Sequence, residues 1–246
     1  MRRRGFLTGV MALGAAPLHA RANGPDGAAL SGDRFMQAGA EMRLADILAP
    51  ATVGLAGGAE PFAEDARRAL AGLLAAGPIT LSEAGKPDRW GRRVVIARDE
   101  NGRSLQEKLI RAGAARVAPE TDEAEFIDAL LAREREARIA RRGLWLLDHY
   151  RVRNALDAND AIGGYHLVEG VVWRAAKARG RIYLNFGADY RTDFTVTARS
   201  VLARRWAKAG FDLLAFEGAR VRARGFVERI NGPSLALSHP KQIERV

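Results

Sequence analysis

The side chains best suited to chemistry gather in the second half of the chain, where aromatic and basic residues are interleaved. In the run 183–186, Tyr-Leu-Asn-Phe, alternate residues would face opposite sides of a strand. Barrels that bind single-stranded nucleic acid stack bases on aromatic side chains within a basic groove. The candidate members of such a groove are Trp173, Tyr183, Tyr190, Arg181, Arg191, Arg222 and Arg224. The alternative is structural: Leu184, Phe186 and Phe194 fill a small core, while Tyr190 and Asn185 support a turn.

Other kinds of site find little support in the sequence. The four histidines are scattered, at positions 19, 149, 166 and 239, so no metal-spaced cluster or serine-histidine-acid set is visible. Cysteine is absent, which excludes disulfides, thiolate metal sites and cysteine nucleophiles. The glycine-rich stretch Gly54–Gly58 lacks the lysine of a phosphate-binding loop, and we interpret it as a plain loop.

Charge divides unevenly along the chain. The net charge of +10 includes four arginines and no acids in residues 1–22. Residues 23–149 hold 18 Lys/Arg against 20 Asp/Glu, whereas residues 150–246 hold 17 against 9. A basic C-terminal half indicates a polyanion partner, DNA or RNA, with a solubilising surface as the alternative.

The first 22 residues have the pattern of a twin-arginine signal peptide. The stretch Arg2–Leu7 contains Arg-Arg-x-Phe-Leu, a short apolar run follows, and Ala20-Arg21-Ala22 is a small-x-small cleavage signal. The apolar run is too short to span a bilayer. We therefore expect export from a bacterial cytoplasm to the periplasm or beyond, with no membrane association after the signal is removed.

The spacing of apolar residues predicts the elements that hold these side chains. In the first half it favours helices over residues 61–75, 105–112 and 122–142, and strands over 79–82 and 94–97. Asp122 and Glu125 have capping-box spacing at the start of the third helix, and Gly143 is a suitable end. The arginine run within that helix (Arg133, Arg135, Arg138, Arg141 and Arg142) is interpreted as a solvated face.

The second half has strand patterns instead. Strands are expected over residues 165–174, 181–186, 193–197, 220–228 and 234–238, with a helix over 200–209. Five strands with a helix after the third is the element order of an OB-fold barrel. We therefore divide the chain into a signal peptide (1–22), a flexible mature N-terminus (23–32), a first domain (33–150), a linker (151–163) and an OB-like domain (164–246).

An ordered set of motifs in the first domain resembles the thermonuclease (staphylococcal-nuclease-like) family. The set comprises Asp88-Arg89-Trp90-Gly91-Arg92, an apolar strand, a helix, Gly113, Val117, Glu134-x-x-Ala137 and Gly143-Leu144-Trp145. With Ser31-Gly32-Asp33 and the stretch through Arg43 and Pro50, the resemblance spans about residues 30–148. The C-terminal half is similar to an OB-like accessory domain found on some bacterial members. The resemblance implies a mainly β, α+β chain with two OB-type barrels in tandem, the first being the nuclease-like barrel with packed helices.

The family's chemistry is calcium-dependent hydrolysis of phosphodiesters. Two arginines and one Ca²⁺ meet the charge that develops on phosphate, and a glutamate handles the attacking water. The resemblance maps the arginines to Arg43 and Arg92 and one calcium ligand to Asp33, and it suggests that Arg89 and Trp90 contact nucleic acid. Calcium is thus the cofactor expected if the site is active.

The sequence departs from the family at the acids. Leu48 stands where the second calcium carboxylate is expected, and Ala51 stands where the water-handling glutamate is expected. The aromatic pair that stacks on the nucleotide appears as Pro119 and Thr121. Asp46, Glu60 and Glu64 are nearby acids that could substitute, or they could be ordinary surface and helix-start residues.

Three hypotheses follow from the sequence. The first is an exported protein that binds nucleic acid or another phosphodiester polyanion, with a degenerate nuclease site. The second is an active nuclease that uses Asp33, Arg43, Arg92 and a relocated carboxylate. The third is a periplasmic protein-interaction module. The sequence does not determine the oligomeric state or the choice between DNA and RNA.

Overall fold

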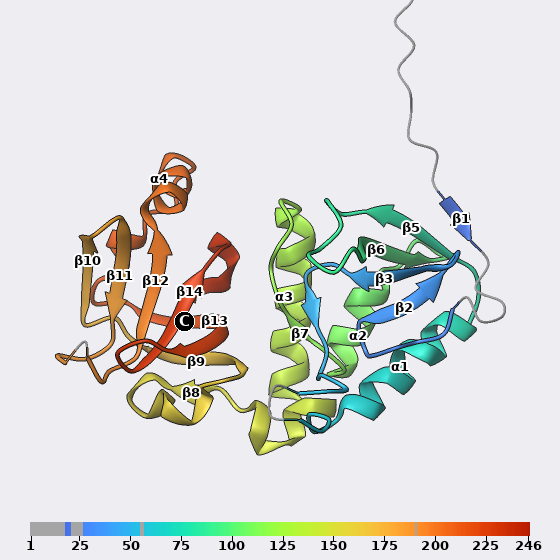
Figure 1. Cartoon of the computed structure of the whole chain (residues 1–246), viewed down its shortest axis with the longest axis horizontal. Coiled ribbons are helices and arrows are strands. Elements are labelled where there is room, and N and C mark those ends of the chain that lie inside the picture. The colour runs from blue at the N-terminus through green and yellow to red at the C-terminus, as the bar shows by residue number, and fades with distance from the viewer. Residues whose placement is uncertain (1–17, 21–26, 55–56, 190) are drawn as a thin grey trace, which may run out of the picture.

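The structure, a computed structural model, describes residues 18–20, 27–54, 57–189 and 191–246. Two domains lie side by side, an N-terminal one (blue to green) and a C-terminal one (yellow to red) (Figure 1). The twin-arginine motif and Tyr190 lie outside the described residues. Within those ranges, no helix has the length and apolar character needed to cross a membrane.

A five-stranded sheet forms the centre of the N-terminal domain, in the order β1-β5-β6-β3-β2. Its strands are β1 (Leu18–Ala20), β2 (Arg34–Gln37), β3 (Ala40–Leu44), β5 (Ile79–Glu83) and β6 (Arg93–Asp99). Strands β3 and β6 are parallel, and the other neighbours are antiparallel. Strand β1 falls within the predicted signal peptide, the rest of which lies outside the described residues.

A separate antiparallel pair joins β4 (Ile47–Leu48) to β7 (Arg116–Val117). Because Ile47 lies opposite Val117, the residues just before β4 lie beside the residues just after β7. This pairing joins segments about 70 residues apart in the sequence, and it determines which side chains surround Arg43.

Three helices pack on this sheet: α1 (Ala63–Ala75), α2 (Leu105–Ala112) and α3 (Ala124–Ile139). Helix α2 begins at Ser104, whose hydroxyl accepts a hydrogen bond from the Glu107 backbone, and ends at Gly113 in the left-handed region. Apolar residues of α1 and α2, such as Leu70 and Leu109, are buried with Phe35 of β2 in one core.

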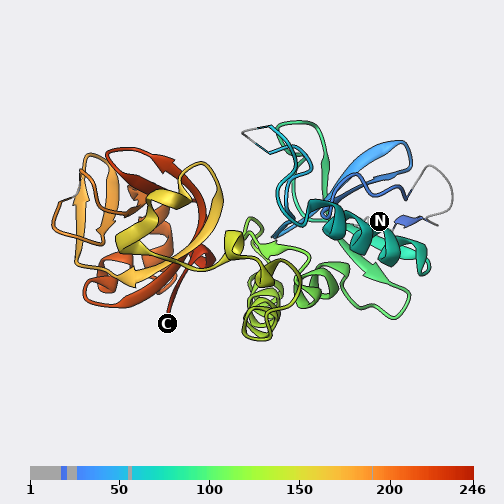
Figure 2. The ribbon, with the colours of Figure 1, turned by 90° about the horizontal axis from the view of Figure 1, so that it is seen from below.

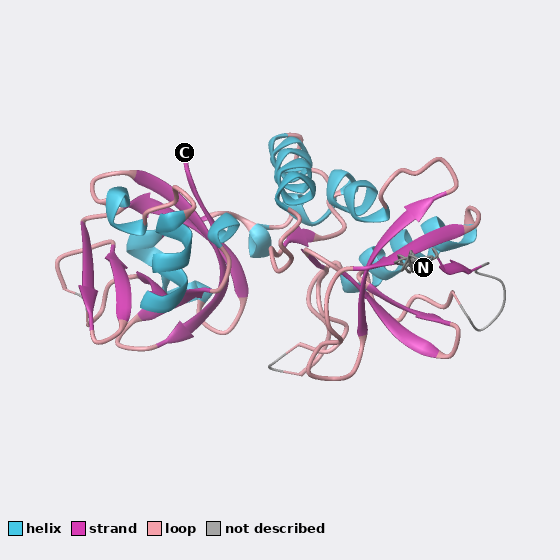
Figure 3. Ribbon diagram, turned by 90° about the horizontal axis from the view of Figure 1, so that it is seen from above, coloured by secondary structure: helices cyan, strands magenta, loops and turns pink. Residues whose placement is uncertain are grey.

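Helix α3 differs from its prediction at both ends. Its N-cap is Glu123, which makes no side-chain capping bond, so the predicted capping box of Asp122 and Glu125 does not form. The helix stops at Ile139 because Arg141 and Gly143 adopt positive φ angles of 49° and 54°, which a right-handed helix excludes. Figure 3 shows α3 on the side of the N-terminal domain that faces the C-terminal domain.

The C-terminal domain is an eight-stranded sheet in the order β10-β11-β12-β14-β13-β9-β8, with β15 also paired to β13. Its strands are β8 (Arg153–Asn154), β9 (Tyr165–Val171), β10 (Arg174–Ala178), β11 (Arg181–Asn185), β12 (Thr195–Arg199), β13 (Arg220–Arg229), β14 (Pro233–Leu237) and β15 (Ile243–Arg245). Helix α4 (Ser200–Lys208) follows β12, and β12 and β14 are parallel. Only Val172 and Trp173 separate β9 from β10, so one stretch of chain supplies β10, at one end of the sheet path, and β9, which lies next to β8 at the other end.

Short 3-10 helices complete the chain: η1 (Gly143–Leu146), η2 (Asp148–Tyr150), η3 (Ala155–Ala161), η4 (Leu213–Phe216) and η5 (Pro240–Gln242). The expected linker 151–163 contains β8 and η3, and Ala155, Ala158 and Ala161 are buried in the C-terminal core. Their spacing of three residues places these alanines on one face of the 3-10 helix. This apolar face was missed in the sequence because many Asp and Asn residues lie between the alanines. Figure 2 shows the yellow-green segment through which the chain passes from one lobe to the other.

A buried ion pair joins the two domains. The guanidinium of Arg224 on β13 lies 2.5 Å from the carboxylate of Glu134 on α3, and both side chains are almost fully buried. Glu134 also accepts a hydrogen bond from the backbone of Val117. The mixed α+β fold class is confirmed, and the two domains share a polar, specific contact.

Candidate functional site

The two arginines predicted to bind phosphate do meet in space. Arg43 lies on β3, and Arg92 comes directly before β6, which runs parallel to β3 with Arg43 opposite Val94. Both point at one carboxylate: Nε of Arg43 is 3.3 Å, and Nε of Arg92 is 2.7 Å, from the same oxygen of Asp88. Asp88 also accepts hydrogen bonds from the backbone of Trp90 and Arg92, so it shapes the loop that carries them.

A second carboxylate, that of Glu120, pairs with the two Nη atoms of Arg43. Both oxygens of Glu120 accept hydrogen bonds from the two Nη atoms of Arg43, each at 2.7 Å. This two-pronged geometry is the strong form of an arginine–carboxylate pair. Burial acts to lower the pKa of Arg43, but the hydrogen bond and charge of Glu120, with the charges of Asp88 and Asp33, raise it above its usual value. A phosphate at this position would therefore have to displace Glu120.

Asp33, the expected calcium ligand, is buried and already hydrogen-bonded. One oxygen accepts the Ser31 hydroxyl at 2.6 Å, and the other accepts the Ala49 backbone N–H at 3.3 Å. The neighbouring Gly32 packs so closely that a Cβ there would lie 2.6 Å from the Cβ of Ala66. The loop is thus pressed against α1, and Asp33 acts within it as a structural acceptor.

The three acids considered as substitutes lie in different environments. Asp46 is fully buried and accepts hydrogen bonds from the Thr121 hydroxyl and from the backbone of Glu120 and Thr121. Glu64 is exposed on α1 and paired with Arg67. Glu60 alone lies beside the altered position, because one of its oxygens accepts the Ala51 N–H at 2.9 Å.

Trp90 forms an exposed aromatic surface next to the two arginines. Its side chain is 63% exposed, and the guanidinium carbons of Arg89 and Arg92 lie 3.9 and 4.4 Å from the ring centroid. The structure thus brings Arg43, Arg92, Arg89 and Trp90 together. A base that stacks on Trp90 would compete with these cation–π contacts.

Comparison with known families decides the identity of this part of the chain. The model of the family described as Staphylococcal nuclease homologue matches residues 41–146. Residues 41–146 form a staphylococcal-nuclease-like domain. A search of curated proteins found no match to the chain. The match ends at residue 146, before the C-terminal domain, so the family assignment does not extend to the C-terminal sheet.

Three of the other predicted contacts, Trp173, Arg181 and Tyr183, lie on or next to strands β10 and β11, on the side of the C-terminal domain away from the nuclease-like domain (Figure 1). On β10, β11 and β12, cross-strand register places Arg174 opposite Asn185, Tyr183 opposite Thr197, and Arg181 opposite Arg199. Directly opposed residues share a face. Tyr183 is half-buried on that face, and Trp173, at the start of β10, is 55% exposed. Tyr183 and the arginines of the nuclease-like site therefore lie in different domains and do not meet.

This region has an excess of positive charge. Residues 174–208 hold nine Lys/Arg against two acids, Asp189 and Asp193. Within the part of the chain that the structure describes, Arg174, Lys177, Arg179, Arg181 and Arg199 make no ion pair with a carboxylate. Arg191 is exposed, and its backbone N–H donates to Asp189. We call the side chains of Trp173, Arg174, Arg179, Arg181, Tyr183 and Arg199 the distal patch, from which Lys177 is left out because it lies opposite the buried Ile182 on the other sheet face.

Several sequence assignments in the C-terminal domain are settled by burial. Leu184, Phe186 and Phe194 are buried, as their core interpretation predicted. Arg222 and Arg224, considered as groove residues, instead contact glutamates at the domain junction. They were misassigned because strand alternation says which residues share a face but not what covers that face.

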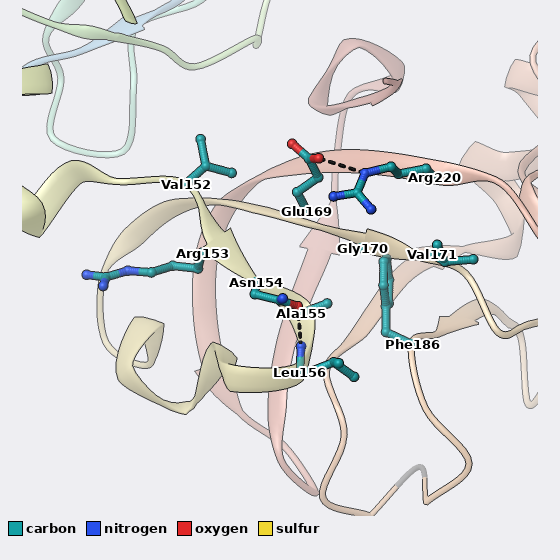
Figure 4. Close-up of a pocket in the computed structure, with 10 residues that line it drawn as sticks. All are labelled: Val152, Arg153, Asn154, Ala155, Leu156, Glu169, Gly170, Val171, Phe186 and Arg220. Carbon is teal, nitrogen blue, oxygen red and sulfur yellow. Dashed lines mark hydrogen bonds and ion pairs between the residues drawn. The ribbon is translucent and has the colours of Figure 1, made fainter. Parts of the chain in front are cut away.

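The described residues also form hollows away from Arg43, Arg92 and the distal patch. One of about 400 Å³ is bounded by residues 152–156 and by β9, and Figure 4 shows the ion pair between Glu169 and Arg220 at its edge. Another, of about 500 Å³, lies at the domain junction and is lined by Glu60, Arg116 and His166 among others. Burial, followed by the charges of Arg116, Arg153 and His149, lowers the pKa of His166 to about 3, so this imidazole is neutral at pH 7.

Metal-ligating groups do not converge in the described ranges. Among those residues, no group of three or more His, Cys, Asp or Glu side chains is placed to hold a metal ion. The residues at 48 and 51 offer no oxygen ligand from their side chains, and Asp33 is turned toward protein donors. The donor set present therefore does not fit the hard, many-oxygen shell that calcium requires.

Glu120 and three of the distal cations, Arg174, Arg179 and Arg199, were not predicted from the sequence, whereas Arg181 was. Glu120 reaches Arg43 only because β4 pairs with β7, a contact between residues 77 apart in the chain. The distal patch had a visible signal in the charge of residues 174–208. The sequence also held a signal for the role of Asp88, because an Asp four residues before an Arg in a tight Trp-Gly loop favours a local ion pair.

Proposed function

We propose that this chain is an exported nucleic-acid-binding protein whose nuclease-like domain does not cleave and whose C-terminal domain provides the main contact with the phosphodiester backbone. The observation that carries the proposal is the contrast between the two candidate surfaces. Arg43 and Arg92 are neutralised by Asp88 and Glu120, whereas the cations of the distal patch have no carboxylate partners among the described residues.

The distal patch has the chemistry of a single-strand contact. Arginines at 174, 181 and 199 lie on one sheet face with Tyr183, and the exposed Trp173 comes directly before β10. Unpaired cations release counterions when they meet phosphates, and aromatic faces stack on unpaired bases. Both effects act on any sequence, so we expect binding with little sequence preference and a preference for single strands over duplex.

Loss of cleavage follows from the replaced acids. Leu48 and Ala51 cannot supply a calcium ligand or a proton acceptor from their side chains. The phosphate-binding arginines are in turn held by internal carboxylates, which stabilises the loop 84–92 and the segment after β7. We infer that these ion pairs have taken over the positions of substrate and metal.

Export rests on the sequence pattern of residues 1–22. The twin-arginine motif and the Ala20-Arg21-Ala22 signal support delivery to the periplasm or outside the cell. Processing after Ala22 would remove β1, which pairs with β5. N-terminal sequencing of the protein recovered from the periplasmic fraction of an expressing bacterium tests this, and an unprocessed cytoplasmic protein would contradict it.

Salt-dependent binding tests the proposal. The mature chain is titrated onto a labelled single-stranded oligonucleotide at several salt concentrations, together with Arg174→Gln/Arg181→Gln and the matched control Arg67→Gln, whose arginine is paired with Glu64. Each phosphate contact contributes about 0.7 to the slope of log K against log salt for a single strand. We expect the double variant to lower the slope by about 1.4 and the control to leave it unchanged.

Equal slopes for all three proteins would contradict the assignment of the distal patch. If the protein binds neither DNA nor RNA at low salt, the third hypothesis, a protein-interaction module, replaces the proposal. One observation keeps a nuclease as the second candidate: Glu60 lies beside Ala51, where the family has its water-handling glutamate. Calcium-dependent cleavage that is lost in Glu60→Gln would establish that candidate.

A further inference from the structure

Arg138 differs from the other arginines at the domain junction. It lies on α3, is half-buried, and its side chain makes no hydrogen bond or ion pair within the described residues. Its Nε atom is buried without a partner. Its two Nη atoms are neither bonded nor buried, so they are open to solvent. A partly desolvated cation without a partner is unfavourable unless something else compensates its charge.

The surroundings of Arg138 add positive charge. It faces Arg222 and Arg224 on β13. These two arginines form ion pairs with Glu134, Glu169 and Glu244, and Arg135 and Arg220 also pair with two of these glutamates. The ion pairs are those of Arg224 with Glu134 at 2.5 Å and with Glu244 at 3.1 Å, Arg222 with Glu169 at 2.7 Å and with Glu244 at 3.5 Å, Arg220 with Glu169 at 2.9 Å, and Arg135 with Glu244 at 3.5 Å. The cluster therefore contains five arginines, counting the unpaired Arg138, and three glutamates, so its net charge is +2.

Electrostatics supports the same view. Burial and the charges of Arg222 and Arg224 lower the pKa of Arg138, although Glu134 and Glu244 act to raise it. Arginine stays charged at any physiological pH, so it cannot relieve this repulsion by losing a proton. An anion that binds at the Nη atoms would relieve it.

We propose that the arginine cluster where α3 meets β13 binds a phosphate-type oxyanion, with Arg138 donating the hydrogen bonds and Arg222 and Arg135 adding positive potential. A guanidinium presents two parallel N–H groups that match the oxygens of phosphate. The ligand is either inorganic phosphate or a phosphate of a nucleic-acid backbone, which have this chemistry in common. The site is separate from the distal patch, since it lies on α3 and β13 at the junction.

Titration with inorganic phosphate at constant ionic strength tests the site on the whole mature chain. Phosphate replaces chloride, and binding is followed by calorimetry and by the thermal midpoint. We expect saturable binding that weakens about tenfold or more in Arg138→Gln, the loss of one charge-assisted contact. The matched control is Arg133→Gln on the same helix, where Arg133 is paired with Glu136, and it should bind phosphate within about twofold of the unmodified chain.

A merely structural role for Arg138 predicts a different result. Without phosphate, Arg138→Gln should keep or raise the thermal midpoint because it removes like-charge repulsion, whereas a structural role would lower it. If Arg138→Gln does not fold, Arg138→Lys serves as the second variant. Lysine keeps the charge but lacks the two parallel N–H groups of a guanidinium, so this variant should bind phosphate more weakly than the unmodified chain does. Equal phosphate affinity in the unmodified chain and in the folded Arg138 variant overturns the proposal, as does a response to phosphate that does not saturate.

A competition experiment identifies the source of the phosphate. A short oligonucleotide that displaces inorganic phosphate from the unmodified chain assigns the site to a nucleic-acid backbone, and failure to displace it assigns the site to free phosphate. The variant Arg174→Gln/Arg181→Gln should bind inorganic phosphate normally. Failure of the distal patch as a nucleic-acid contact is thus distinguishable from failure of this site.

Discussion

Replacing Glu120 by glutamine should release Arg43 for phosphate binding. Glutamine keeps the shape and the backbone contacts of the segment after β7 but removes the charge that grips Arg43 at 2.7 Å. The Glu120 side chain is 36% exposed. Because solvent screens such a pair, we take its contribution to the free energy of unfolding as about 1 kcal/mol. Freed Arg43 should add one phosphate contact worth about the same, which corresponds to about fivefold tighter binding.

Binding of a single-stranded oligonucleotide across a salt series measures the effect. One added phosphate contact should steepen the slope of log K against log salt by about 0.7. Glu83→Gln is the control, because it also removes one negative charge but breaks the exposed pair with Arg93. An unchanged affinity and slope in Glu120→Gln would refute the view that Glu120 blocks the phosphate position, and an equal gain in Glu83→Gln would show an effect of net charge alone.

Three further predictions concern the framework. Arg224→Met leaves Glu134 buried and unpaired, so urea denaturation should show a loss of about 3–5 kcal/mol, and a loss under about 1 kcal/mol would contradict the buried pair. Gly32→Ala forces a Cβ to 2.6 Å from that of Ala66, and a loss of about 1–3 kcal/mol is expected in the same assay, with an unchanged midpoint as the opposing result. The pKa of His166 is about 3 in the folded chain and 6.5 in the unfolded chain, so as the pH falls the unfolded chain binds the proton at a higher pH. Stability should therefore fall as the pH drops below 6.5, by about 2 kcal/mol at pH 5, and His166→Gln should flatten that fall, whereas an equal slope would contradict it.

The sequence was sufficient for those parts of the fold that depend on local pattern. The helix expected over residues 105–112 depends on neighbours within a few residues, and the structure shows it as α2 with those bounds. The end of α3 was missed because left-handed backbone at Arg141 precedes the glycine expected to stop the helix. The alanines of η3 were missed because small residues give a weak periodic signal among many polar ones.

The candidate site divides in the same way. The convergence of Arg43 and Arg92 was implied by the family resemblance, and the charge of residues 174–208 could be counted directly. The partners of those arginines could not be predicted, because Glu120 depends on the register of β4 against β7 and Arg224 depends on how two domains pack. Which cations remain without partners is a property of the tertiary structure. That property separates the distal patch and Arg138 from the many paired arginines.

The most direct test of the account is a single incubation of the mature protein with labelled single-stranded DNA, once with calcium and once with chelator, read for both retention and cleavage. The account predicts that DNA is retained in a salt-dependent manner, that the strand stays intact, and that calcium makes no difference. Robust cleavage that chelator abolishes, and that Arg43→Gln abolishes as well, would contradict it and would show that the nuclease-like site works without acids at positions 48 and 51.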